Sequence, residues 1–83
     1  MTLHERIVRD PVICGGQPTF RGTRVLLRTV LGYLAHGERT ETLLSDFPTL
    51  TEDDVRAAIA FAAASAAEDL PAPPPAPKDL KVA

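Results

Sequence analysis

The sequence predicts a mainly helical domain: a three-helix core of helix-turn-helix type, with a short N-terminal β-hairpin and a proline-rich C-terminal arm. Apolar residues recur at helical spacing between residues 27 and 67, and β-branched residues flank a Gly-Gly pair before them. Five prolines fall within residues 71–77. Because 83 residues suffice for one small domain, we place that domain at residues 1–69 and the arm at residues 70–83.

The residues before the first helix favour extended structure. Residues 6–9 include two β-branched side chains, and residues 18–21 form a second extended stretch. Gly15 and Gly16 lie between them and permit a turn that needs positive φ angles. A two-stranded element is marginally stable in water, so it must pack on helices or pair with another chain. We therefore predict a homodimer through this β element.

Two short helices are expected next. The first carries an apolar stripe at spacings of three and four residues: Leu27, Val30, Leu31 and Leu34. Gly37 follows this stripe, where a glycine commonly ends a helix. Thr40 is the expected N-cap of the second helix, and Pro48 stops it. The apolar face of the second helix is expected to consist of Leu43, Leu44 and Phe47.

The third helix has a strong start signal. Thr51 is the expected N-cap, and Asp54 stands three residues further on, where the acid of a capping box belongs. Residues 57–67 are excellent helix formers. The stripe that faces inward is expected to contain Val55, Ile59 and Ala62 or Ala63. Phe61 lies off that stripe, so we expect it to pack against another element.

The charges divide the chain into a basic first part and an acidic second part. Residues 1–39 hold six arginines and three acids, a net charge of +3, whereas residues 40–83 hold three bases and eight acids, a net charge of −5. These arginines form either an ordinary solvated surface or a basic face offered to nucleic acid or to an acidic partner. The candidates for nucleic-acid binding are Arg6, Arg9, Arg21, Arg24 and Arg28.

The start of the third helix weighs against the usual mode of DNA recognition. A recognition helix presents its N-terminal end to the major groove. Here that end carries Glu52, Asp53 and Asp54, whose carboxylates would face the phosphates. If the domain binds DNA, the arginines of the β segment are therefore better placed to do so.

Several classes of protein are not expected. One cysteine and two histidines are too few for a disulfide framework or a structural zinc site. The chain has no apolar run long enough for a membrane span and no secretion signal, so we expect a cytoplasmic protein with Cys14 reduced and buried. His36 is expected at a helix end. With no phosphate-binding loop and no paired nucleophile and base, we predict neither an enzyme nor a cofactor or metal.

Two segments share motifs with a known family. Residues 7–25 read IVRDPVICGGQPTFRGTRV, and residues 46–59 read DFPTLTEDDVRAAI. The spacing of G-G-x-P, G-T-R and P-x-L-T resembles the signature of the domain-of-unknown-function 433 family, bacterial antitoxin-like proteins, over residues 5–66. The motif positions are Gly15, Gly16, Pro18, Gly22, Thr23 and Arg24.

This resemblance implies a homeodomain-like or winged-helix core preceded by a β element. It also implies the antitoxin of a type II toxin–antitoxin pair, which binds a small toxin of PIN-like nuclease fold and represses its own operon through DNA. From the residues themselves, we expect the glycines and Pro18 to shape the hairpin and Thr23 to cap the first helix. Arg24 would then stand in the first turn and bind a phosphate or an internal carboxylate, although a purely structural role for the motif stays open.

The predicted function is that of an antitoxin which neutralises a PIN-like ribonuclease by direct binding. Such a nuclease holds a divalent metal on carboxylates, so an inserted arginine or lysine could bind these carboxylates and block the active site. The candidate toxin-binding residues are Arg21, Arg24, Lys78, Leu80, Lys81 and Val82. Two alternatives remain: a stand-alone DNA-binding transcriptional regulator, and a structural adaptor or assembly subunit that docks through the proline-rich arm.

Overall fold

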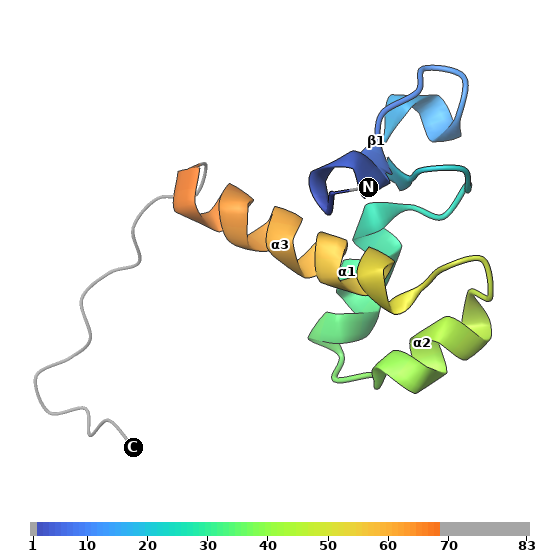
Figure 1. The fold of residues 1–83 in the computed structure, drawn as a ribbon, viewed down its shortest axis with the longest axis vertical. Coiled ribbons are helices and arrows are strands. Elements are labelled where there is room, and N and C mark those ends of the chain that lie inside the picture. Colours follow the sequence, from blue (N-terminus) through green and yellow to red (C-terminus); the bar gives the residue numbers. More distant parts are fainter. Residues whose placement is uncertain (1, 69–83) are drawn as a thin grey trace, which may run out of the picture.

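The computed structural model describes residues 2–68, which form three α-helices and a small antiparallel sheet (Figure 1). In chain order the elements are the 3-10 turn η1 (His4–Arg6), strand β1 (Ile7–Val8), the 3-10 turn η2 (Cys14–Gly16), strand β2 (Thr19–Phe20), and helices α1 (Leu27–Ala35), α2 (Thr40–Asp46) and α3 (Glu52–Glu68). The mainly helical class with an N-terminal two-stranded element is thus confirmed. The predicted proline-rich arm lies outside the described residues.

The sheet leads directly into the first helix. Ile7 pairs with Phe20 and Val8 with Thr19 in antiparallel register. A further β-bridge joins Thr19 to Leu26, the residue before α1. The sheet therefore sets the position at which α1 begins.

The core forms where the sheet meets the three helices. Phe20 of β2 is fully buried, and burial of such a side chain stabilises a fold by about 1.5–3 kcal/mol. The other buried apolar residues are Leu27, Val30, Leu43, Leu50, Val55, Ala57 and Ala58. Leu43 and the half-buried Leu44 and Phe47 confirm the apolar face predicted for α2.

The end of α1 follows the sequence prediction. Gly37 adopts a φ of 80°, in the left-handed region that favours glycine. Its N–H donates to the carbonyl of Leu34 over 3.0 Å, and the N–H of Glu38 donates to the carbonyl of Tyr33 over 3.0 Å. These two bonds form a Schellman motif, which satisfies carbonyls that the last helical turn leaves free.

The start of α3 also follows the prediction. The Thr51 N–H donates to Oδ2 of Asp54 over 2.9 Å, and the Asp54 N–H donates to Oγ1 of Thr51 over 3.3 Å. This reciprocal pair is a capping box with Asp54 in the place of the usual glutamate.

The predicted cap of α2 was wrong by one residue. Thr40 is the first residue of the helix, and Arg39 occupies the cap position without a side-chain cap bond. The reason lies in the backbone: the Leu43 N–H donates to the Arg39 carbonyl over 3.0 Å, so the first helical turn already begins at Arg39.

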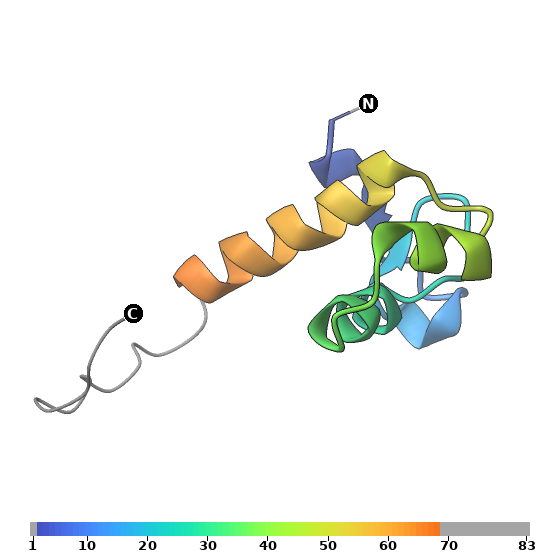
Figure 2. The same cartoon turned by 90° about the horizontal axis from the view of Figure 1, so that it is seen from below.

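The predicted inward stripe of α3 was partly wrong. Val55 is buried, but Ile59 is 53% exposed. Ile59 lines an open groove with Thr40 and Glu41 at the start of α2, and α2 does not cover it. The buried face of α3 instead contains Asp54, Ala57 and Ala58, and the later turns extend beyond the core (Figure 2).

Candidate functional site

The motif glycines are turn residues. Gly15, Gly16 and Gly22 have φ angles of 64°, 82° and 78°. The carbonyl of Pro18 accepts a hydrogen bond from the N–H of Leu27 over 2.9 Å, which ties the hairpin to α1. Each glycine thus occupies a left-handed backbone position that other residues reach only with strain, as expected for residues that shape the hairpin.

Thr23 and Arg24 do not have the positions predicted for them. The Thr23 hydroxyl donates to the carbonyl of Phe20 over 2.8 Å and accepts the N–H of Val25 over 3.1 Å. Thr23 therefore closes the turn after β2 and does not cap α1, which begins at Leu27. Because two more residues, Val25 and Leu26, separate it from α1, Arg24 lies exposed in the segment between the turn and the helix, and not in the first helical turn.

Cys14 is half-buried, not fully buried as predicted. It has a φ of 50°, which is uncommon for a residue other than glycine, and its thiol donates to the carbonyl of Arg24 over 3.4 Å. This contact joins the two motif turns to each other and gives the thiol a structural partner.

Arg6 is committed to the fold and is not a free cation. Its Nη1 lies 3.3 Å from Oδ1 of Asp54, and its Nη2 lies 3.4 Å from Oδ2 of Asp53. Arg56 contacts the other oxygen of Asp53 at 3.6 Å. Two carboxylates that the sequence placed at the start of α3 are thus partly neutralised by the N-terminal segment, and Arg6 is removed from the set able to bind nucleic acid.

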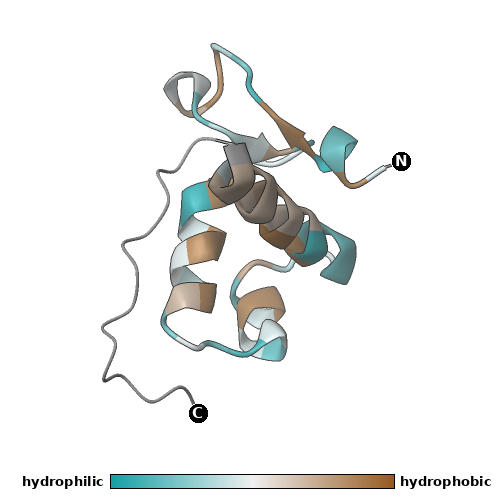
Figure 3. Ribbon diagram, turned by 90° about the vertical axis from the view of Figure 1, so that its left-hand side faces the viewer, coloured by the Kyte–Doolittle hydropathy of each residue, from teal (hydrophilic) through white to brown (hydrophobic). Residues whose placement is uncertain are grey.

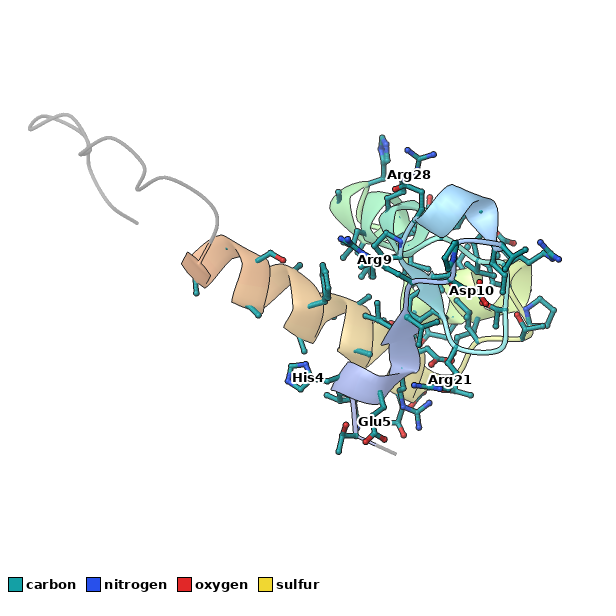
Figure 4. All side chains as sticks on the ribbon, turned by 90° about the horizontal axis from the view of Figure 1, so that it is seen from above. His4, Glu5, Arg9, Asp10, Arg21 and Arg28 are labelled. Carbon is teal, nitrogen blue, oxygen red and sulfur yellow. The ribbon has the colours of Figure 1, made fainter. Side chains whose placement is uncertain are left out.

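The remaining arginines do not form a single face. Arg21 donates from Nε to the carbonyl of Glu5 over 2.7 Å. Arg28 lies on the opposite side of the molecule from Glu5 and Arg21 (Figure 4). Within residues 2–68, Arg9, Arg24 and Arg28 are exposed and make no ion pair.

A groove of about 370 Å³ is lined by residues of α1, α2 and the segment between them. Arg28, Gly32 and Tyr33 come from α1, Asp46 from α2 and Glu38 from that segment. The Tyr33 hydroxyl donates to Oδ2 of Asp46 across the groove over 2.9 Å. The hydrogen bond to Asp46, together with burial and the negative charges of Asp46 and Glu38, raises the pKa of Tyr33 above its ordinary value of 10.0.

His36 and the other side of Tyr33 complete this groove. His36 caps the C-terminal end of α1, as predicted, and also lines the groove. The Tyr33 ring packs edge-on against Phe47 with ring centres 5.3 Å apart. The Tyr33 ring is therefore held on one side by the core and at its hydroxyl by Asp46.

The last turns of α3 form the second notable surface. Residues 59–67 contain no charged side chain. Yet Ile59 is 53% exposed, Phe61 is 37% exposed, and Ala63, Ala64, Ala66 and Ala67 are exposed as well. In Figure 3 these turns point toward the viewer and lack the hydrophilic colour of the start of the helix. Neither Ile59 nor Phe61 was identified as exposed from the sequence.

Some predictions fall beyond the described part of the chain or lack a test within it. Lys78, Leu80, Lys81 and Val82 lie outside the described residues. Within residues 2–68, no three histidine, cysteine or acidic side chains gather in a way that could hold a metal ion. No helix in that range has both the length and the apolar character to cross a membrane. Homodimerisation through the β element stays a prediction.

Comparisons with known proteins identify relatives along most of the domain. Residues 7–62 match the family described as "Protein of unknown function (DUF433)". The chain is 36% identical over 61 residues to the uncharacterized protein y4eO of Sinorhizobium fredii, a match that spans 74% of this chain and 28% of that protein. It also resembles the crystal structure of a DUF433 member from Anabaena variabilis, with a TM-score of 0.69 and 32% identity over 80% of this chain and 65% of that one. The chain thus covers less than two thirds of either relative.

Proposed function

Because this chain belongs to the DUF433 family and projects an uncharged helix end from its core, we propose that it is an antitoxin that binds and neutralises a PIN-like ribonuclease. The observation that carries the proposal is that six of the nine residues from 59 to 67 of α3 are exposed although none of the nine is charged. An uncharged helix surface that is rich in apolar residues is normally buried against another element.

The geometry of the helix end indicates how a partner would hold it. Ile59 and Phe61 are two residues apart and so point in directions about 160° apart around the helix axis. A flat surface could cover only one of them. The partner therefore presents a groove that receives the helix from more than one side, which is a common mode of helix recognition.

The residues that follow α3 supply the neutralising contact. Lys78 and Lys81, two of the predicted toxin-binding residues, follow in the sequence ten and thirteen residues after Glu68, the last residue of α3. Docking of the helix end would bring these lysines near the partner surface at a high effective concentration. A lysine placed on the carboxylates of a metal-dependent nuclease would compete with the metal ion and block the substrate.

The acidic start of α3 favours a protein partner over DNA. We infer a helix-turn-helix type of core from the order of α1, α2 and α3, as in homeodomain or winged-helix proteins. Asp53 and Asp54 then lie where a recognition helix would meet phosphates, and Asp54 is locked there by Arg6 and Thr51. Repression of an operon is a second candidate, favoured by the exposed Arg9, Arg24 and Arg28, and a steep loss of DNA affinity with salt would support it.

The proposal is tested by capture and by inhibition of a nuclease. The tagged chain, produced at its native level in the source cell, is expected to recover a small PIN-like protein in near-equal amount. When isolated, that protein should cleave RNA, and it should lose this activity when one equivalent of this chain is added.

A matched pair of variants locates the contact. Ala63→Glu adds a charge to an exposed position of the projecting helix and should abolish capture. Val12→Glu adds the same charge to an apolar residue that is 84% exposed on the hairpin loop, and should leave capture intact. Recovery of the bait alone, or a captured protein whose nuclease activity this chain does not inhibit, contradicts the antitoxin proposal.

A further inference from the structure

Gly32 occupies a position where nothing in the described structure needs a glycine. It lies in the middle of α1, where glycine favours a helix less than alanine does. A Cβ built on Gly32 would meet no heavy atom within 4 Å, and its φ is not in the left-handed region. The missing side chain leaves the backbone of α1 open toward the groove, where a group from outside the chain can approach closely.

The groove beside Gly32 is lined by charges of both signs. Arg28 lies on α1 and makes no ion pair with any residue from 2 to 68, and His36 lines the groove at the end of that helix. The acidic lining residues are Asp46 on α2 and Glu38 in the segment between α1 and α2. Asp46 is exposed and uses Oδ2 for the Tyr33 hydroxyl, while no described residue hydrogen-bonds its other oxygen. A matching ligand therefore carries an anion and a hydrogen-bond donor at different ends.

We propose that this groove binds a nucleotide with an exocyclic amino group. The base lies over Gly32, its amino group donates to the carboxylate of Asp46 or Glu38, and its phosphate contacts Arg28. The guanidinium fork of arginine matches phosphate oxygens, and acidic side chains accept the amino group of cytosine. The volume of about 370 Å³ falls in the range of known small-molecule sites.

Simpler ligands leave part of the groove unexplained. An inorganic anion would use Arg28 and His36 but gain nothing from the two carboxylates. A cationic side chain would use the carboxylates but would be repelled by Arg28. A planar ring that joins an anion to an amino group uses both charges and the open backbone at Gly32, so the nucleotide accounts for the most features.

This site is separate from the surface proposed to bind the toxin. None of the residues that line the groove belongs to α3. Loss of toxin capture by Ala63→Glu would leave nucleotide binding unchanged, and loss of nucleotide binding would leave toxin capture unchanged. The two proposals can therefore fail independently.

The test uses the full chain in an NMR titration with cytidine monophosphate and uridine monophosphate. These two nucleotides differ at the position of the exocyclic amine, which only the cytidine compound has. We expect the Gly32 amide to shift on addition of the cytidine compound, with about tenfold tighter binding than for the uridine compound. A single-stranded oligocytidine, compared with the monophosphate, shows whether the source is a free nucleotide or a nucleic-acid strand.

Two variants and one control variant keep the result interpretable if binding is weak. Gly32→Ala should raise Tm, because alanine favours the helix, and should weaken binding by covering the open backbone. Arg28→Ala should weaken binding about tenfold, whereas Arg39→Ala, which removes an exposed arginine that does not line the groove, should not. Binding of the oligonucleotide alone, if it depends on Gly32, supports the site with a strand as its source. The proposal is overturned if the Gly32 amide shifts with neither cytidine monophosphate nor oligocytidine, if cytosine and uracil bind with equal affinity, or if Gly32→Ala leaves the affinity unchanged.

Discussion

The two ends of α3 differ in how many bonds and contacts their side chains make with the rest of the chain. At the start, Asp54 bonds both the backbone and the side chain of Thr51 and also accepts a hydrogen bond from Arg6, 48 residues away in sequence. At the other end, Ile59 and Phe61 are exposed among alanines. The start of the helix thus forms its bonds within the chain, whereas the end exposes apolar surface that another molecule could cover.

This difference shows where mutation should affect stability and where it should affect binding. A group with several partners inside the fold leaves them unsatisfied when it is removed. A side chain with few neighbours can be changed at little cost to the folded state. Matched substitutions at the two ends of α3 should therefore differ in their effect on the free energy of unfolding.

The largest difference in the free energy of unfolding is expected between Ala58→Glu and Ala63→Glu on the same helix. Ala58 is fully buried, so a glutamate there would bury an unpaired charge in a filled core. We expect a loss of about 4 kcal/mol or more in the free energy of unfolding, which is most of the stability of a small domain. Ala63 is exposed, and its variant should stay within about 0.5 kcal/mol of wild type. Urea unfolding followed by circular dichroism measures both values.

Equal destabilisation by the two glutamates would contradict the contrast between the ends of α3. It would mean that the last turns of the helix are packed within the isolated chain, and that they are not available to a partner.

A medium contrast is expected between Asp54→Ala and Asp53→Ala. The first removes the capping-box acid and one partner of Arg6, in a site where the Asp54 side chain is 12% exposed. We expect a loss of about 2–3 kcal/mol. The second removes a side chain that is itself 53% exposed, together with its ion pairs to Arg6 and Arg56, and should cost about 1 kcal/mol or less. Thermal unfolding at matched protein concentration compares the two variants. A larger loss of stability for Asp53→Ala would contradict the structural role of the Asp54 bonds to Thr51 and Arg6.

The smallest effect is expected for Asp46, which is exposed, unlike Asp54, and whose substitution should mainly change the pKa of Tyr33. Tyr33 is the single tyrosine of the chain, so its ultraviolet absorbance reports its ionisation directly. The hydrogen bond to Asp46 raises the pKa of Tyr33 above 10.0, and Asp46→Ala should lower that pKa toward the ordinary value. An unchanged titration curve in the variant would show that the bond across the groove does not form in solution.

The same pKa has a consequence for stability at high pH. A tyrosine whose pKa is higher in the folded than in the unfolded state favours the folded state at all pH values below about 10. This contribution is lost as the pH rises through the raised pKa of Tyr33. The high-pH loss of stability should therefore be smaller in Asp46→Ala than in wild type, as measured by urea unfolding across that range.

The sequence alone predicted the features that depend on neighbouring residues. The end of α1 at Gly37 and the capping box of Thr51 and Asp54 are local, because a φ angle or a bond across three residues is decided within one turn. The hairpin glycines belong to the same class. The family motif also lies in such local segments, which is why the resemblance was found from residues 7–25 and 46–59.

Only the tertiary structure decided how these elements face one another. Helical periodicity identified Val55 as a core residue but could not tell that Ile59 lies on a side that α2 leaves uncovered. Arg6 looked like a free base in the sequence, since its acidic partners lie 47 and 48 residues further on. The groove above Gly32 likewise needs both α1 and α2 to exist. Backbone conformation is set by short-range sterics and hydrogen bonds, whereas exposure and ion pairing depend on which distant surfaces meet, and that is settled only when the chain packs.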